Sequence, residues 1–203
     1  MTAFRRRICD ACIADAPVFS DRPALFRAAF AACGVDGWVA EFGVYKCGTL
    51  RTIASHFAGE IVHGFDSFEG LQEHWFGPKN PANPLHTVGA YKVPNYEELQ
   101  FPNNSEIHVG LVQNTVPEFI AEQAGPAKFM HIDTDTYLPA AAILQICANR
   151  IVPGTVIQFD EFFGYPGWEN HEARAFVEWL MRENRDAVPI GRVSAWQLAV
   201  KIV

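Results

Sequence analysis

Two groups of carboxylates stand where apolar runs of the sequence end. Asp133 and Asp135 follow the run Lys128–Ile132, and Asp160–Glu161 close the run Thr155–Phe159. If these runs are consecutive strands of a parallel sheet, their acids meet at one edge, where clustered carboxylates need a cation or protons between them. Carboxylate oxygens suit magnesium better than a soft metal. The sequence therefore predicts a divalent-metal site at this edge.

A second constellation upstream has the form of a nucleotide site. The expected strand Gly37–Phe42 runs into the glycine-bearing turn Glu41–Gly48, and a helix to about His56 follows. Glycines ahead of a helix N-terminus let the backbone approach a ligand closely. Asp66 ends the next expected strand, Glu60–Phe65, about 20 residues after the turn, which is the spacing of an acid that holds ribose hydroxyls. The pattern therefore favours a nucleoside-containing cofactor.

The elements that must position these residues alternate along the chain. We expect further strands at 106–110 and 194–203, helices from 115, over 138–150 and over 171–184, and a helical segment over 1–35 that packs on the sheet. Residues 67–102 are too long for an ordinary connection, so we interpret them as a lid, with a partner surface as the alternative. The alternation predicts an α/β fold with a doubly wound, mainly parallel sheet of the Rossmann-like type.

Composition restricts the partners. The chain has 203 residues and a formal net charge of −7, which argues against nucleic acid as the main partner, because binding to its backbone needs clustered Lys and Arg. No apolar run reaches the roughly 18 residues of a membrane span, and no signal-peptide core follows the N-terminal arginines. Five scattered cysteines do not form a secreted disulfide framework. We expect a cytoplasmic protein with a small-molecule partner, no nucleic acid and no membrane.

Two enzymatic alternatives share parts of these motifs. A nicotinamide-dependent oxidoreductase would use the glycine turn and Asp66, but Gly43 and Gly48 do not have the GxGxxG spacing, and the acids would have no role. An aspartyl phosphatase would use Asp133-Thr-Asp135-Thr, but no lysine that could stabilise a transferring phosphoryl group lies between Tyr137 and Asp160. A non-catalytic cofactor-binding domain is a third alternative.

The order of the motifs resembles a known family. The segments Glu41–Gly48, Phe65–Leu71 (FDSFEGL), Ile132–Tyr137 and Phe159–Gly164 are similar to those of macrocin-type O-methyltransferases, which methylate sugar hydroxyls of macrolides with S-adenosylmethionine. The similarity extends from about residue 36 to the C-terminus, with FDSFEGL as its most specific segment. It implies a class I methyltransferase domain over 36–203, with a seven-stranded sheet whose C-terminal strand is antiparallel.

The resemblance also implies roles for individual residues. The cofactor would contact residues of the glycine turn and the next two strand ends: Glu41, Gly43, Gly48, Asp66, Ser67, Phe68 and Gly110. Magnesium would be held by the first acid of one motif and the acidic pair of the next: Asp133, Asp160 and Glu161. The family has two aspartates where this chain has Asp160–Glu161.

The sequence leaves more than one candidate for the catalytic base and for the methyl acceptor. A base must remove the proton from the acceptor hydroxyl, and our first candidate is Asp135, with His86 in the expected lid as the second. Both residues also have a non-catalytic interpretation: Asp135 as a helix N-cap, and His86 as a solvent-exposed loop histidine. A sugar of a natural product and a catechol-like phenol would use the same metal chemistry. The helical N-terminal segment could also pair two copies of the chain into a homodimer.

Overall fold

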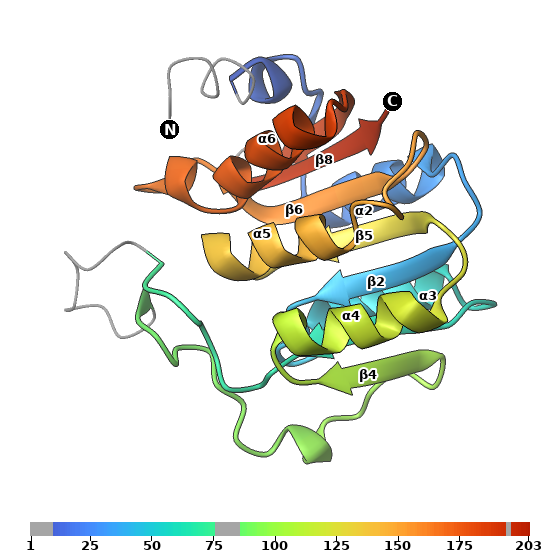
Figure 1. Ribbon diagram of the computed structural model, residues 1–203, viewed down its shortest axis with the longest axis vertical. Helices are drawn as coiled ribbons and strands as arrows, with labels where there is room; N and C mark the ends of the chain where they lie inside the picture. Colours follow the sequence, from blue (N-terminus) through green and yellow to red (C-terminus); the bar gives the residue numbers. More distant parts are fainter. Residues whose placement is uncertain (1–9, 76–85, 194–195) are drawn as a thin grey trace.

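The computed structural model describes residues 10–75, 86–193 and 196–203, and its centre is an eight-stranded sheet in the order β1-β7-β8-β6-β5-β2-β3-β4 (Figure 1). Strands β6, β5, β2, β3 and β4 are mutually parallel, whereas β8 is antiparallel to both β6 and β7. The strands are β1 (Val18–Phe19), β2 (Trp38–Phe42), β3 (Val62–Asp66), β4 (Ser105–Val109), β5 (Ala127–Ile132), β6 (Val156–Phe163), β7 (Ala187–Val193) and β8 (Trp196–Ile202). This arrangement confirms the expected α/β fold with a mainly parallel sheet.

Helices cover both faces of the sheet. They are α2 (Arg22–Ala32), α3 (Gly48–His56), α4 (Val112–Glu122), α5 (Tyr137–Ile146) and α6 (Glu172–Glu183), with short 3₁₀ helices η2 (Tyr96–Glu98) and η3 (Trp168–Asn170). Helices α4, α5 and α6 lie side by side on one face, and α2 and α3 lie behind the sheet in Figure 1. Each layer buries its own apolar cluster against the sheet, so the strands are covered on both sides.

Central strands meet in nearly level register at their carboxyl ends. Phe42 of β2 pairs with Phe65 of β3 and with Ile132 of β5, and Ile132 pairs with Phe159 of β6. Residues that follow these four positions therefore emerge along one edge of the sheet. Ligands of open α/β sheets bind at this edge, outside the carboxyl ends of the strands.

Several sequence-based boundaries were wrong. Residues 1–35 are not helical throughout, because Val18–Phe19 forms β1 and pairs with the end of β7, and the sheet has eight strands rather than seven. Strand β7 itself was not predicted. Strand β6 does not stop before Asp160 but continues to Phe163, because a register shift lets Phe163 pair with Trp196 of β8. Helix α4 begins at Val112, three residues earlier than expected, and contains Pro117.

The segment between β3 and β4 forms two limbs that are joined by backbone hydrogen bonds. Leu71 N donates to Ala90 O at 2.9 Å, and Gly89 N donates to Leu71 O at 2.9 Å. Phe76 of the expected lid, like Cys9, lies outside the described residues. The four described cysteines are free thiols. None of the helices in the described ranges combines the length and apolarity needed to cross a bilayer.

Candidate active site

The turn after β2 requires glycine at its first position. Gly43 has φ +94°, and a Cβ there would lie 1.7 Å from the carbonyl oxygen of Asp133. Hydrogen bonds of 2.8 Å from Gly43 N to Phe65 O and from Asp133 N to Phe42 O join the ends of β2, β3 and β5. The glycine turn and the first acid of the carboxylate cluster are therefore in direct backbone contact.

Asp66 connects the glycine turn to the segment after β3. Its Oδ2 accepts a hydrogen bond of 2.7 Å from Tyr45 N, and its Oδ1 accepts one of 2.7 Å from Phe68 N. Burial raises the pKa of this carboxyl, while the backbone donors oppose the rise. Each carboxylate oxygen has a further lone pair, so Asp66 can still accept hydrogen bonds from hydroxyl groups.

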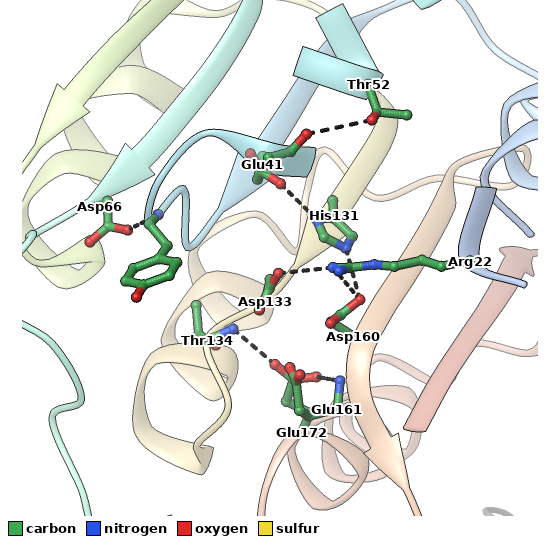
Figure 2. A network of polar contacts seen from close by, with 12 residues as sticks. Arg22, Glu41, Thr52, Asp66, His131, Asp133, Thr134, Asp160, Glu161 and Glu172 are labelled. Carbon is green, nitrogen blue, oxygen red and sulfur yellow. Dashed lines mark hydrogen bonds and ion pairs between the residues drawn. The ribbon is translucent and has the colours of Figure 1, made fainter. Parts of the chain in front are cut away.

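Asp133, which follows β5, lies close to Asp160 and Glu161 of β6 (Figure 2). Carboxylate oxygens of Asp133, Asp135 and Glu161 all lie within 4.8 Å of one another. Asp160 instead forms an ion pair with Arg22, whose Nη2 also lies 3.1 Å from Asp133 Oδ2. The first residue of α2 thus places a guanidinium group between two acids that are 27 residues apart in the chain.

His131 supplies a second cation beneath these acids. Its Nδ1 lies 3.0 Å from Glu41 Oε1, its Nε2 lies 3.6 Å from Asp160 Oδ1, and its side chain is fully buried. Burial alone would lower the pKa of His131, but the nearby carboxylate of Asp160, the hydrogen bond to Glu41 and the charge of Asp133 raise the pKa to about 9. His131 is therefore an imidazolium ion at neutral pH.

Glu172, in the first turn of α6, joins the two acid-bearing segments. Its Oε1 accepts a hydrogen bond of 3.1 Å from Thr134 N, and its Oε2 accepts one of 3.3 Å from Glu161 N. The side chain is fully buried, and burial raises the pKa of its carboxyl well above the usual range. Glu172 holds the backbone between Asp133 and Asp135 at a fixed distance from β6.

Carboxyl groups outnumber cationic side chains in the described part of this cluster. Arg22 and His131 are the cations beside a set of five carboxylates: Asp133, Asp135, Asp160, Glu161 and Glu172. Burial and the neighbouring acids raise the pKa values of Asp133 and Glu161 well above the usual range and that of Asp135 to about 7. Glu161 Oε2 is buried without a hydrogen-bond partner among the described residues. Such a group needs a proton or a cation.

One cavity of about 550 Å³ joins the glycine turn to the acids. One part of the cavity lies beside the glycine turn and is lined by Gly43, Gly48, Asp66, Ser67 and Gly110. A second part is acidic and is lined by Asp133, Asp135, Asp160 and Glu161, together with Arg22. A third part of the wall is apolar and aromatic, and is formed by Leu71, Trp75, Tyr91 and Trp196. The ring of Trp75 packs edge-on against that of Trp196, with centroids 5.9 Å apart.

Three residues expected at the site do not line this cavity. Glu41 lies behind it and holds His131, and the ring of Phe68 stacks on Tyr96 with centroids 4.4 Å apart. The ring of His86 packs edge-on against Trp75 at 5.3 Å, away from the acids. Asp135 is not the N-cap of α5, since Thr136 occupies that position and Asp135 itself has φ +61°.

Three residues of the acid cluster were not predicted. Arg22 and Glu172 come from helices distant in sequence, and local spacing indicates neither. His131 stood within the apolar run before Asp133, where a buried imidazole could have been taken as a partner for acids. A buried histidine between apolar residues was the one available signal.

Comparisons with known proteins place the fold. No protein-family model and no curated protein sequence matches the chain. The solved structure of CalS11, a calicheamicin methyltransferase, superposes with a TM-score of 0.65 at 22% identity, over 88% of this chain and 76% of that one. An O-methyltransferase from Bacillus cereus in complex with SAH gives 0.57 at 17% identity, over 98% and 89%. The mycinamycin-pathway methyltransferase MycE, in complex with Mg and SAH, gives 0.52 at 16% identity, over 89% and 48%.

The superpositions with CalS11 and the Bacillus cereus protein cover most of this chain, and thus most of its eight-stranded sheet. Five parallel strands are followed by an antiparallel strand, β8, inserted between β6 and β7. The cavity lies at the carboxyl ends of the parallel strands, as expected for an open α/β sheet. The chain therefore has the Rossmann-like fold of the class I methyltransferases.

Proposed function

We propose that the chain is an S-adenosylmethionine-dependent O-methyltransferase that acts with magnesium on a hydroxyl group of a small molecule. One observation carries this proposal: a single cavity contains both the glycine turn with Asp66 and the carboxylate cluster. An oxidoreductase would leave the cluster without a role. The fold shared with CalS11 and the resemblance to macrocin-type enzymes support the same conclusion.

The cavity residues fit the cofactor. A volume of about 550 Å³ lies within the roughly 300–1,000 Å³ typical of small-molecule sites. Gly43 and Gly48 place no side chain at the two ends of the turn, and the N-terminus of α3, which starts at Gly48, favours an anionic group such as a carboxylate. Asp66 would accept hydrogen bonds from the ribose hydroxyls, with Ser67 and Gly110 beside the adenosine. The bound cofactor supplies an electrophilic methyl group.

The carboxylates fit a hard cation. Asp133 and Glu161 would be its ligands, since their oxygens converge with those of Asp135 and Glu161 Oε2 lacks another partner among the described residues. An ion there would lower the pKa of an acceptor hydroxyl. The third ligand would be Asp160 by sequence pattern, whereas the structure brings Asp135 closer and pairs Asp160 with Arg22.

The remaining wall suits the acceptor and its deprotonation. Burial and the charges of Asp160 and Asp66 raise the pKa of Asp135 to about 7. A cation held by Asp133 and Glu161 would lower this pKa and favour the carboxylate form that a base needs near neutral pH. Trp75 and Trp196 would hold the apolar face of a sugar or a phenolic ring and exclude water from the acids.

The cofactor assignment can be tested by calorimetric titration with S-adenosylhomocysteine, with and without magnesium. Binding at micromolar level by the wild type, and its loss in Asp66→Ala, would support the proposal and justify screening sugar and catechol acceptors. Absence of binding under both conditions would refute it. A matched thermal melt separates loss of binding from loss of folding, since Asp66 also accepts hydrogen bonds from Tyr45 and Phe68.

The roles of two acids can be separated by Asp135→Asn and Asp160→Asn. If Asp135 is the base, its variant keeps the magnesium affinity of the wild type and loses methyl transfer. If Asp135 is instead the third ligand, the same variant loses both, and Asp160→Asn retains magnesium. Calorimetry with magnesium reports the first property, and formation of S-adenosylhomocysteine from S-adenosylmethionine in the presence of an acceptor reports the second.

A further inference from the structure

A second group of metal-ligating side chains lies away from the cavity, between the edge of the sheet and α4. In the parallel pair β3–β4, His63 is in register with Glu106 and Phe65 with His108, so the side chains of these residues share one face. Phe119 of α4 packs on this face, with ring centroids 4.5 Å from His63 and 5.4 Å from His108. Two histidines and a glutamate are thereby held together by strand pairing and helix packing.

The three side chains converge. His63 Nδ1 lies 3.2 Å from His108 Nε2, and the oxygens of Glu106 lie 3.9 Å from each of these nitrogens. Two nitrogens bound to one tetrahedral zinc ion, each at roughly 2.0–2.1 Å, are about 3.3 Å apart. The imidazole nitrogens already have this separation. Glu106 has an exposed side chain (62%), which can move closer at little cost.

The protonation states favour a metal ligand over an ion pair. Burial lowers the pKa of His63, and the neighbouring His108 lowers it further. Burial also lowers the pKa of His108, although Glu106 and Glu122 oppose this. Both rings are therefore neutral at pH 7, and neutral imidazole is the form that binds a metal. Without an ion, one ring can only donate its N–H to the other.

The group is open to solvent, because the side chain of Glu106 is exposed. His63 also lines a second cavity of about 330 Å³, whose other walls come from the starts of β2 and β3 and from Gln123 and Gly125 after α4. The group contains no residue of the proposed methyl-transfer site. We propose that His63, His108 and Glu106 form a separate site for zinc or a similar imidazole-preferring divalent ion, with water as a fourth ligand, that fastens the edge strand β4 to β3.

The test is a calorimetric titration of chelator-treated, full-length protein with zinc in excess magnesium. The wild type should bind one more equivalent of zinc than His108→Gln, or bind it more than about 100-fold more tightly, since loss of even an indirect partner of a metal costs about 10–100-fold. Glu106→Gln should weaken binding by a smaller factor. His56→Gln, which removes an exposed histidine outside the group, should match the wild type.

A structural readout keeps the test independent of the variants' folding. Zinc should shift the ring nitrogen signals of His63 and His108 in NMR spectra of the wild type and leave those of His56 in place. Zinc should also raise the melting temperature of the wild type but not of His108→Gln. Equal zinc binding by wild type and His108→Gln, or unshifted signals of His63 and His108, would overturn the proposal. This result is independent of methyl transfer.

Discussion

Replacement of Gly43 by alanine should destabilise the fold at the junction of β2, β3 and β5. The added Cβ would lie 1.7 Å from the carbonyl oxygen and 2.7 Å from the carbonyl carbon of Asp133. Both are backbone atoms, so no side-chain rotation can relieve the overlap. The positive φ of +94° is in addition unfavourable for any residue with a Cβ.

The size of the effect follows from these two contributions. A non-glycine residue at a sparsely populated φ costs about 1–3 kcal/mol. Overpacking adds about 1–3 kcal/mol, and because the obstacle is backbone we expect the upper part of that range. A total of at least ~3 kcal/mol corresponds to a melting temperature lower by roughly 6–12 °C for a chain of this size. Differential scanning calorimetry with urea denaturation measures both quantities.

Gly48→Ala is the matched control within the same turn. A Cβ at Gly48 would meet no described atom within 4 Å, and Gly48 is the first residue of α3, where alanine is preferred to glycine. Its melting temperature should stay level or rise by about 1–3 °C. Because Gly48 lines the cavity, however, its affinity for S-adenosylhomocysteine should fall.

The two variants can refute separate parts of the reasoning. If Gly43→Ala melts within about 2 °C of the wild type, the close approach of the turn to Asp133 is not a constraint on the fold. If Gly48→Ala is stable and binds S-adenosylhomocysteine as the wild type does, the cofactor does not lie against the start of α3. The first result would leave the proposed function intact, whereas the second would weaken it.

Three further variants have defined outcomes. Asp66→Asn should bind S-adenosylhomocysteine about 10–100-fold more weakly by calorimetry, because hydrogen bonds to a charged acceptor contribute about 1.5–3 kcal/mol, while the exposed Asp36→Asn should bind normally. Burial lowers the pKa of His171, so below about pH 6.5 the unfolded chain binds a proton that the folded chain does not. The stability advantage of the wild type over His171→Gln in urea should therefore shrink from pH 7 to pH 5, and a constant difference would contradict this. Arg22→Gln should bind magnesium about fivefold more tightly, because the Arg22 ion pair with Asp160 no longer opposes the metal and a partly exposed ion pair contributes ~1 kcal/mol, which corresponds to that factor. An unchanged or weaker affinity in calorimetry would show that Arg22 does not compete with the ion.

The central strands could be predicted from sequence because each is buried on both faces. Strands β2, β3 and β5 read as short apolar runs that end in an acid or a glycine turn, and their observed bounds lie within two residues of the expected ones. The same pattern placed Asp66 and Asp133 at strand ends, where they line the cavity. Local patterns were sufficient here because burial and strand termination are both encoded within a few residues.

The β1 edge of the sheet and the full length of β6 could not be predicted in this way. Strand β1 has two residues, too few for any periodicity, and exists because Val18 and Phe19 pair with Arg192 and Val193 at the other end of the chain. The continuation of β6 through Asp160–Glu161 depends on its pairing with β8. These features follow from contacts between distant segments, which no local window contains.

The charge balance of the site depends on one such distant segment, helix α2. Asp21 caps this helix by accepting a hydrogen bond of 2.8 Å from Ala24 N, which fixes the position of the first residue, Arg22. One turn later, the ring of the buried Phe26 lies 5.1 Å from the ring of His131 and 5.8 Å from the Arg22 guanidinium. Helix α2 therefore positions the Arg22 guanidinium and packs against the His131 imidazolium, and both cations face the acids.

This coupling explains why the acids could be predicted and their counter-charges could not. Each carboxylate belongs to the strand that carries it, so its place follows from strand termination and parallel pairing. Arg22 reaches Asp133 across 111 residues of sequence, and it does so only once α2 has packed on the sheet. The site has more carboxyl groups than cations among the described residues, and burial with the neighbouring acids raises the pKa values of Asp133, Glu161 and Glu172, which favours their protonated forms while no cation is bound. The packing of α2 thus supplies one counter-charge, to Asp133 and Asp160, and a divalent ion could take the place of the protons on Asp133 and Glu161.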